Sequence, residues 1–194
     1  MKIEPAVLEN AFARLEPLDK AHREDLRAAC DADPTIWTEL YPYSWAGEHF
    51  EPTWDRVAGE IAAGRSIVYA VTVDGRCVGV SGFGLTNAIH DVVEIGGTYF
   101  APDHRGGAVN PSAKRLMMHH AFASGARRIA FQVDALNRRS RAAVLKLGAV
   151  QEGLLRQDRV CWTGRIRDTV MFSVLADEWP AVRDRLDARL ATFG

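Results

Sequence analysis

The sequence is poor in cysteine, and its cysteines are not paired. Cys30, Cys77 and Cys161 are the three cysteines in 194 residues, and no C-x-x-C spacing occurs. An odd number of isolated thiols argues against a disulfide framework and against a cysteine-ligated zinc site. Reduced thiols of this kind are typical of the cytoplasm, so we expect a cytoplasmic protein.

Long apolar runs and an excess of charge of one sign are also missing. No segment has the roughly 20 apolar residues of a membrane helix, and the N-terminal segment, with Lys2 and Glu4, does not read as a signal peptide. The chain has 24 basic and 25 acidic residues, a net charge of −1, and no basic stripe. We therefore expect neither nucleic-acid binding nor membrane binding.

The histidines show no metal-binding pattern. His119 and His120 are neighbours in an expected helix and point to different faces, unlike an i, i+4 ligand pair. The remaining histidines have no partner at ligand spacing, so we expect no metal. Repeats and low-complexity linkers are absent as well. With 47 % hydrophobic and 25 % charged residues, the chain is expected to form a single domain over residues 1–194.

The most informative stretch runs from residue 92 to residue 122. Its first part, Val92–Phe100, is rich in β-branched and aromatic residues and predicts a strand. A glycine loop over residues 105–110 follows. Asn110 is a good N-cap and Pro111 suits the first helical position, so a helix is expected to begin there.

A strand, a glycine loop and a helix N-terminus together favour an anion site. The first turn of a helix has unpaired N–H groups and a partial positive charge. Gly106 and Gly107 allow further N–H groups to point to the same place, and phosphate is the usual ligand there. Lys114 and Arg105 are expected to help hold the anion. A glycine-rich turn with two solvated cations explains the same residues equally well.

The remaining elements follow from periodicity and turn residues. Strands are expected at 11–18, 66–73, 77–85, 127–134, 150–160 and 166–175, and helices at 19–29, 52–63, 137–147 and 177–190. Asp74-Gly75 and Thr163-Gly164 are hairpin turn signals. Residues 33–50 are crowded with aromatic residues and broken by prolines, which predicts an aromatic loop rather than a regular element.

The order of the short motifs resembles a known family. E-I-G-x-x-x-x-x-P-x-x-R-G-G, then a helix, then V-D-x-x-N-x-x-S and K-L-G-A, resembles the GNAT superfamily of N-acetyltransferases, and most of all its branch of ribosomal-protein N-acetyltransferases, RimJ and RimL. The resemblance covers roughly residues 12–175 and implies an α/β fold, a mixed, mostly antiparallel sheet of about seven strands flanked by helices.

The resemblance also implies a cosubstrate and its binding residues. Acetyl-CoA would bind through its pyrophosphate on the loop and helix start, with Asn137 near the pantetheine arm. The residues implied are Arg105, Gly106, Gly107, Ala108, Val109, Asn110, Lys114 and Asn137. Arg105 matches the first family position, whereas Ala108 stands where the family usually has glycine and Asn110 where it has glycine or alanine.

Catalytic roles follow from the same resemblance. On the residues alone, Glu94 in its strand fits a solvated sheet face; the resemblance implies a general base that deprotonates the acceptor amine. Many family members carry a tyrosine acid where this chain has Val144, and Ser140 is the remaining candidate for protonating the thiolate. The aromatic segment helps form the acceptor side in such enzymes, and Trp37 and Tyr41 are the residues expected there. The alternative for most of these rings is that they cover the core.

These inferences predict an acetyl-CoA-dependent N-acetyltransferase without a metal. The acetyl group would pass directly to a primary amine, on a protein N-terminus or on a small molecule. The alternative is a CoA-binding domain with sensing or partner-binding duties and no turnover. The sequence leaves open the identity of the acceptor, the length of the acyl chain and the oligomeric state, including a homodimer.

Overall fold

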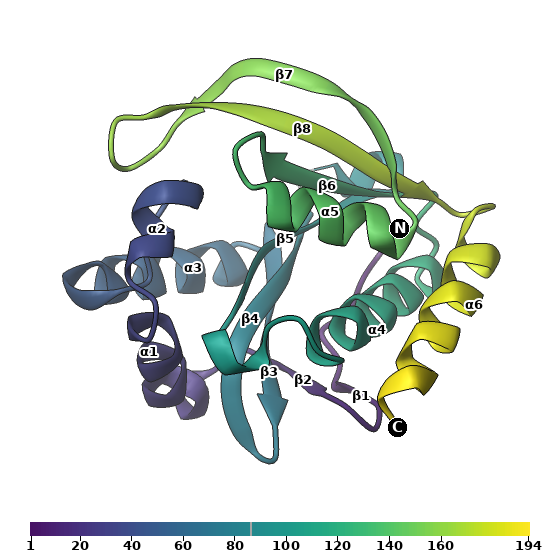
Figure 1. The fold of residues 1–194 in the computed structure, drawn as a ribbon, viewed down its shortest axis with the longest axis horizontal. Coiled ribbons are helices and arrows are strands. Elements are labelled where there is room, and N and C mark those ends of the chain that lie inside the picture. Colours follow the sequence, from purple (N-terminus) through teal and green to yellow (C-terminus); the bar gives the residue numbers. More distant parts are fainter. Residues whose placement is uncertain (86) are drawn as a thin grey trace.

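The computed structural model describes residues 1–85 and 87–194, in which one open sheet carries helices on both faces (Figure 1). In this part of the chain the sheet has eight strands in the order β1-β2-β3-β4-β5-β6-β8-β7. They are β1 Leu8–Glu9, β2 Arg14–Pro17, β3 Ser66–Val73, β4 Arg76–Gly84, β5 Val92–Phe100, β6 Arg128–Asp134, β7 Val150–Val160 and β8 Ile166–Leu175. β5 and β6 are parallel and the other neighbours are antiparallel. The expected mixed α/β architecture is confirmed, with one strand more than expected.

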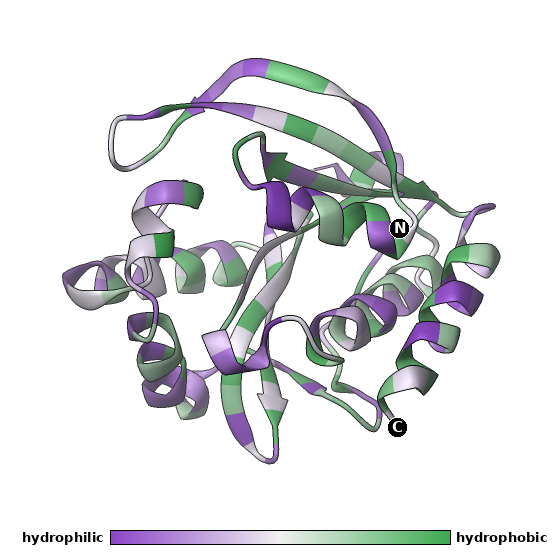
Figure 2. Cartoon of the chain, in the orientation of Figure 1, coloured by the Kyte–Doolittle hydropathy of each residue, from purple (hydrophilic) through white to green (hydrophobic). Residues whose placement is uncertain are grey.

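Two layers of helices enclose the sheet. α1 (Arg23–Asp31), α2 (Thr35–Leu40) and α3 (Phe50–Ala62) lie on one face, whereas α4 (Val109–Ala123) and α6 (Trp179–Leu190) lie on the other, and α5 (Arg138–Leu147) follows β6 (Figure 1). Each face has its own apolar core: one cluster includes Met117 of α4 and the other Phe50 of α3. In Figure 2 hydrophilic and hydrophobic residues alternate along α6, as expected for a helix with one buried face.

The turn signals of the sequence are found where they were expected. Asp74 and Gly75 both have positive φ angles, 50° and 76°, which suits the two-residue hairpin between β3 and β4. Gly148, with φ 99°, ends α5, and Asn137 caps its start by accepting from the N–H of Ser140 at 2.9 Å. Local turn chemistry therefore determines the ends of these elements.

Two local expectations were wrong. Residues 33–50 are not irregular throughout, because α2 forms within them and a 3₁₀ turn covers Gly47–His49. Ile36 and Trp37 of α2 are buried in the core under α1, so tertiary packing stabilises a helix that the local sequence favours weakly. α4 begins at Val109 with Ala108 at the N-cap position, so Asn110 lies in the first turn and is not the cap.

The parallel pair β5 and β6 separates after three residue pairs. Val92, Val93 and Glu94 pair with Arg128, Ile129 and Ala130, and beyond this point the two strands continue without pairing. On its other edge, β5 has one residue more than β4, since Val80 pairs with Tyr99 but Gly82 with Gly96. This irregularity is a β-bulge at the Gly96-Gly97 pair, where Gly97 has φ 60°. The sheet is therefore open on one side of Glu94 and distorted on the other.

In the described ranges, no helix is both long and apolar enough to cross a membrane.

Candidate active site

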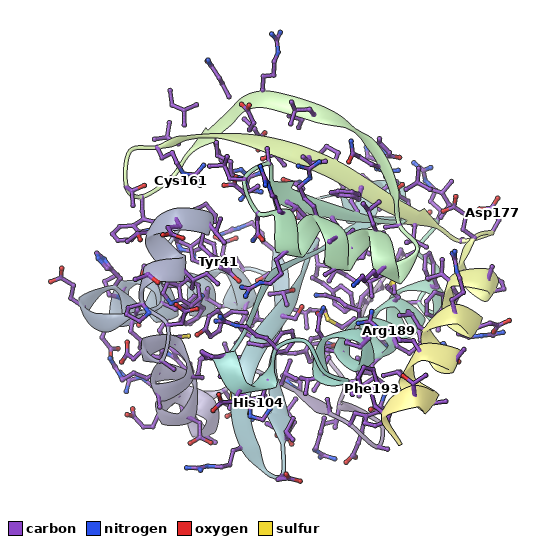
Figure 3. All side chains as sticks on the ribbon, viewed as in Figure 1. Tyr41, His104, Cys161, Asp177, Arg189 and Phe193 are labelled. Carbon is purple, nitrogen blue, oxygen red and sulfur yellow. The ribbon has the colours of Figure 1, made fainter. Side chains whose placement is uncertain are left out.

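A cleft of about 500 Å³ occupies the gap between β5 and β6. Residues Ile95–Phe100 of β5 line one side of the cleft, and Phe131 and Val133 of β6 line the other. The cleft also reaches the start of α4 and one side of α5. Tyr41, after α2, and Arg189, on α6, also line it; Figure 3 shows the two residues far apart across the molecule. A long, narrow ligand can therefore lie between the strands with its ends near different elements.

The loop before α4 offers backbone donors to this cleft. In the part of the chain that the structure describes, the backbone N–H groups of residues 106–110 have no hydrogen-bond partner. Gly106, with φ 82°, turns the chain, and Gly106, Gly107 and Asn110 line the cleft. Unpaired N–H groups at a helix start attract phosphate oxygens, so the loop fits the expected pyrophosphate site. Val109, by contrast, faces the core.

Arg105 braces this loop. Its Nε donates to the carbonyl oxygen of Phe100 at 2.7 Å, and its Nη1 lies 2.6 Å from Oδ2 of Asp33. Nη2 of the same guanidinium is buried and has no partner among the described residues. The pair lowers the pKa of Asp33, mainly through the hydrogen bond from Arg105. Arg105 therefore has its Nη2 group left for a ligand in the cleft, while Nε and Nη1 hold the loop.

The position of Lys114 in the first turns of α4 had suggested that its side chain points to the loop, but it does not. Its Nζ donates to Oγ of Ser81 at 2.8 Å and to Oγ1 of Thr98 at 2.5 Å. The side chain is buried and lines the cleft, and in the described residues no carboxylate lies within 4 Å of its Nζ. Burial lowers the pKa of this ammonium group to about 7. Lys114 thus ties α4 to β4 and β5 just beside the bulge.

Glu94 stands where β5 and β6 separate. Its carboxylate lines the main cleft and also a second cavity of about 190 Å³ on the other side of the bulge. Burial raises the pKa of Glu94, and the nearby Arg159 and Arg167 oppose this shift. A Cβ on Gly96 would come within 2.7 Å of Oε1 of Glu94. The glycine therefore leaves room for this carboxylate at the junction of the two cavities, whereas a solvated sheet face would leave it exposed.

Glu94 is connected to a polar network that sequence reasoning missed. Gln132 Nε2 donates to Oε2 of Glu94 at 2.9 Å, and Gln132 Oε1 accepts from Nη2 of Arg159 at 2.6 Å. Arg159 Nε in turn donates to Asp158 at 2.8 Å. A signal was present in the sequence: Gln132 interrupts the buried I-x-F-x-V pattern of β6, which places it on the face opposite Phe131 and Val133.

Asn137 and Ser140 lie at the start of α5 and both line the cleft. The Oδ1 atom of Asn137 is used by the helix cap, which leaves its amide NH₂ for a ligand. Ser140 is half-buried. Val144, at the position of the missing tyrosine, is buried beside them and offers no proton. Ser140 therefore carries the side-chain hydroxyl that α5 offers to the cleft.

The aromatic residues divide between cleft and core. Tyr41 lines the cleft, and its hydroxyl donates to the carbonyl oxygen of Thr98 at 2.7 Å. Trp37 is 1 % exposed and packs behind Tyr41 with 4.5 Å between ring centroids, so it supports the wall and does not itself face the cleft. Tyr43, which was not singled out from the sequence, lines both cavities.

The tip of the β7–β8 hairpin closes this wall from outside. Trp162 donates from its backbone N–H to Pro42 at 3.1 Å and from Nε1 to the carbonyl oxygen of Trp37 at 3.0 Å. Figure 1 shows the long hairpin extending over the sheet toward α2, and Figure 3 labels Cys161 at this tip. Segments about 125 positions apart in sequence therefore meet at the part of the cleft wall that includes Tyr41 and Pro42.

Metal binding has no support from the geometry. In the ranges 1–85 and 87–194, no group of three or more His, Cys, Asp or Glu side chains is placed to hold a metal ion. The donors that the cleft offers are N–H groups, hydroxyls and guanidinium groups, which suit phosphate, carbonyl and carboxylate groups.

Comparison with known proteins assigns the family. The model of the acetyltransferase (GNAT) domain matches residues 13–150. A search of the curated proteins finds no match. Among solved structures, a GCN5-related N-acetyltransferase from Brucella melitensis is 30 % identical, with a TM-score of 0.88 over 96 % of this chain and 86 % of that one.

The fold is also shared with more distant relatives. Mycobacterium smegmatis RimJ, in complex with CoA-disulfide, is 24 % identical, with a TM-score of 0.79 over 96 % of this chain and 93 % of that one. RimL, the ribosomal L7/L12 alpha-N-protein acetyltransferase in complex with coenzyme A, is 18 % identical, with a TM-score of 0.77 over 89 % of this chain and 99 % of that one. With the family model spanning most of the sequence, the chain belongs to the GNAT family and is an acetyl-CoA-dependent N-acetyltransferase.

Proposed function

We propose that this protein transfers the acetyl group of acetyl-CoA to a primary amine by direct attack in a ternary complex, with Glu94 as the general base. The observation that carries the proposal is the position of Glu94, which lines both cavities at the point where β5 and β6 part. Acetyl-CoA would occupy the main cleft from the loop at residues 105–110 to Glu94, and the acceptor would occupy the part of that cleft lined by Tyr41, Tyr43 and Arg159, together with the second cavity. The acceptor is a protein N-terminus or a small-molecule amine; the fold shared with RimL supports the first class.

The cosubstrate would be held mainly by backbone groups. The free N–H groups of residues 106–110 and the Nη2 group of Arg105 suit the pyrophosphate, at one end of β5. The unpaired edge of β5 beyond Glu94 suits the amide groups of the pantetheine arm, and the free amide of Asn137 faces the same cleft. Lys114, whose Nζ donates to Ser81 and Thr98, would line the same part of the cleft. These contacts would place the thioester near the bulge.

The chemical step requires a neutral amine. An ammonium acceptor first loses a proton, which Glu94 takes directly or through water, and the nitrogen then attacks the thioester carbonyl carbon. The C–N bond forms and the nitrogen gives up its second proton; the C–S bond breaks, and the thiolate leaves with the electron pair of that bond and takes up a proton, so that the second proton ends on the sulfur. Ser140 is the candidate donor for the thiolate. A base with a raised pKa holds the amine proton more firmly, and the raised pKa of Glu94 is consistent with this task. Alignment of the two substrates supplies much of the remaining rate enhancement.

The test is an acceptor panel with acetyl-CoA, read as release of free thiol and as mass gain of the acceptor. N-terminal peptides, amino acids, polyamines and aminoglycosides form the panel. Turnover of at least one amine, abolished by omitting either substrate, is the expected result. Direct transfer to an amine is contradicted if acetyl-CoA raises the melting temperature but is only hydrolysed, with no acetylated product, in the presence of every amine of the panel.

A further inference from the structure

The acceptor side of the sheet holds three arginines, and one of them has no hydrogen-bonded carboxylate. Three arginines of the β7–β8 hairpin, Arg159, Arg165 and Arg167, face Asp134 and Asp158. Asp158 accepts from Arg159 at 2.8 Å, and Asp134 lies 2.5 Å from Arg165. Each carboxylate thus has one arginine of its own, and Arg167 is the third.

Arg167 is buried, with 5 % of its surface exposed. Its Nε donates to Oγ1 of Thr169 at 3.0 Å, and its Nη2 donates to the backbone oxygen of Gln132 at 3.3 Å. Its closest carboxylate in the described residues is Asp134, at 3.9 Å, which is already paired. Nη1 has no hydrogen-bond partner in the described chain. Glu94 is the other nearby carboxylate, since Arg159 and Arg167 both act to lower its pKa, but in the described residues it makes no hydrogen bond to Arg167. A buried guanidinium group without a hydrogen-bonded anion is costly unless a ligand completes it.

The guanidinium of Arg167 lies on the acceptor side of the cleft and not at the glycine loop of residues 105–110, which is the proposed phosphate loop. Arg159 and Arg167 both line the main cleft, and Gln132 links them to Glu94, since it receives hydrogen bonds from both arginines and donates to Glu94. The phosphate loop follows Phe100, six residues and roughly 20 Å of strand away from Glu94. The phosphates of the cosubstrate would therefore not reach these arginines while bound at the loop.

The charged residues that line the second cavity together with Glu94 add no unpaired carboxylate in the described residues. In the second cavity, Glu60 is paired with Arg65 at 2.8 Å, and Arg56 lies over the ring of Tyr43 at 4.4 Å without a carboxylate within 4 Å in the described residues. A polycationic acceptor would meet repulsion here, whereas a carboxylate would meet a fixed pair of donors.

We propose that the acceptor carries a carboxylate close to its reactive amine, and that Arg167, with Arg159 beside it, binds this carboxylate while Glu94 takes the proton of the amine. The inference rests on the proposed function and narrows its acceptor class. The carboxylate is either the α-carboxylate of a free amino acid or an acidic side chain near a peptide N-terminus. Bidentate guanidinium binding would orient the amine as well as hold it.

Matched acceptors test this proposal. One arm compares free amino acids with their carboxamides, which differ in charge, in one hydrogen-bonding group and in the pKa of the amine; the carboxamide has the lower amine pKa, so amine supply alone would favour the carboxamide. A second arm compares C-terminally amidated peptides with glutamate or glutamine at the second position. Spermidine represents the cationic acceptors. We expect kcat/KM to favour the carboxylate member of one arm by about 10- to 100-fold, and the arm that responds identifies the source of the carboxylate.

Two variants connect the preference to the arginines. Arg167→Gln should reduce the preference for the acid over the amide to about threefold or less, mostly through the KM of the acid, and Arg167→Lys should restore part of it. Arg159→Gln, at a half-exposed side chain, serves if the buried substitution lowers stability too far. Arg128→Gln, which removes a surface arginine paired with Glu152 outside the cleft, is the matched control and should change nothing.

The outcomes separate this inference from the proposed function. If no amine is acetylated, the proposed function fails, whatever the arginines do. If amines are acetylated but acid and amide are used equally by the wild type, or if both arginine variants retain the full preference, the carboxylate site is overturned while the proposed function stands. Faster use of spermidine than of every acid also overturns it.

Discussion

Gln132 donates a hydrogen bond of 2.9 Å to Glu94 across the point where β5 and β6 stop pairing. The bond connects two strands that no longer share a backbone ladder, and it holds the carboxylate between the two cavities. Gln132 also accepts from Arg159, so the orientation of the amide is determined on both sides. The candidate base is thereby fixed by side chains, at the place where the backbone has opened for a ligand.

Replacing Glu94 by glutamine should lower kcat by about 10²-fold or more, because the side chain keeps its size and loses its basicity. The pKa of Glu94 is raised by burial, so the active, ionised form becomes more abundant as pH rises. The wild-type rate should therefore climb with pH through this pKa, and the variant should lack that limb. Its deficit should shrink at high pH, where free amine is abundant.

The control for this variant is the shift in melting temperature with acetyl-CoA, which should match that of the wild type because Glu94 is remote from the phosphate loop. A glutamine variant with wild-type kcat between about pH 6 and pH 9 would show that the carboxylate is structural and that the proton leaves by another route.

Acetyl-CoA and CoA should raise the melting temperature, since they bind only the folded protein. Arg105→Ala should weaken this shift, with an affinity loss of about tenfold for one charged hydrogen bond. Gly107→Pro should weaken it too, because proline removes an N–H and restricts φ. Thermal melts over a range of acetyl-CoA concentrations measure both effects.

Asp33→Asn is the matched control, because it breaks the ion pair with Arg105 but keeps the guanidinium. Its melting temperature without ligand should fall about as far as that of Arg105→Ala, with the ligand-induced shift retained. An unchanged melting curve for the wild type at saturating acetyl-CoA would contradict the assignment of the loop.

Tyr41→Ala should raise the KM for the amine more than the KM for acetyl-CoA, because this ring lines the cleft on the side that we propose for the acceptor. Trp37→Ala should behave differently: the ring is buried, and its loss should lower the free energy of unfolding by about 3 to 5 kcal/mol. Steady-state kinetics and urea melts separate the two. Equal losses on both substrates in Tyr41→Ala, in step with lost stability, would assign that ring to the core.

Lys114 should make stability depend on pH. Its pKa is about 7 in the folded protein, because of burial, and about 10.5, the ordinary value for lysine, in the unfolded chain. Between these values the unfolded chain binds one more proton, so the free energy of unfolding rises with pH. The wild type should gain about 1 kcal/mol per pH unit relative to Lys114→Met over this range. Denaturant melts of both proteins at several pH values measure this difference. If the free energies of unfolding of the two proteins change in parallel with pH, the lowered pKa of Lys114 is contradicted.

Ser140→Ala should lower kcat only a few-fold, because serine is a weak acid and the thiolate leaves readily. The N-cap of α5 survives the change, since Asn137 accepts from the backbone N–H of residue 140. Kinetics with saturating substrates provide the test. A loss of about 10²-fold at unchanged stability would make Ser140 a required acid.

Much of this protein could be predicted from local sequence. The strand at 92–100, the glycine loop, both hairpins and the cap of α5 depend on turn residues, periodicity and capping, which act over a few positions. The loop at residues 105–110 could be predicted as an anion site because the donors in question belong to the backbone that the glycines and the helix start expose. The family resemblance added the cosubstrate and pointed to Glu94.

The tertiary structure decided what the individual side chains do. Glu94 reaches both cavities only because the β5–β6 pairing ends there and a bulge follows, and both depend on strands distant in sequence. Lys114 turned to Ser81 and Thr98, and Trp37 entered the core in a short helix, because packing outweighs local preference. Arg167 is brought to Gln132 by a strand pairing across 35 positions. Such contacts join positions that no local pattern connects, so their geometry was decided by the fold.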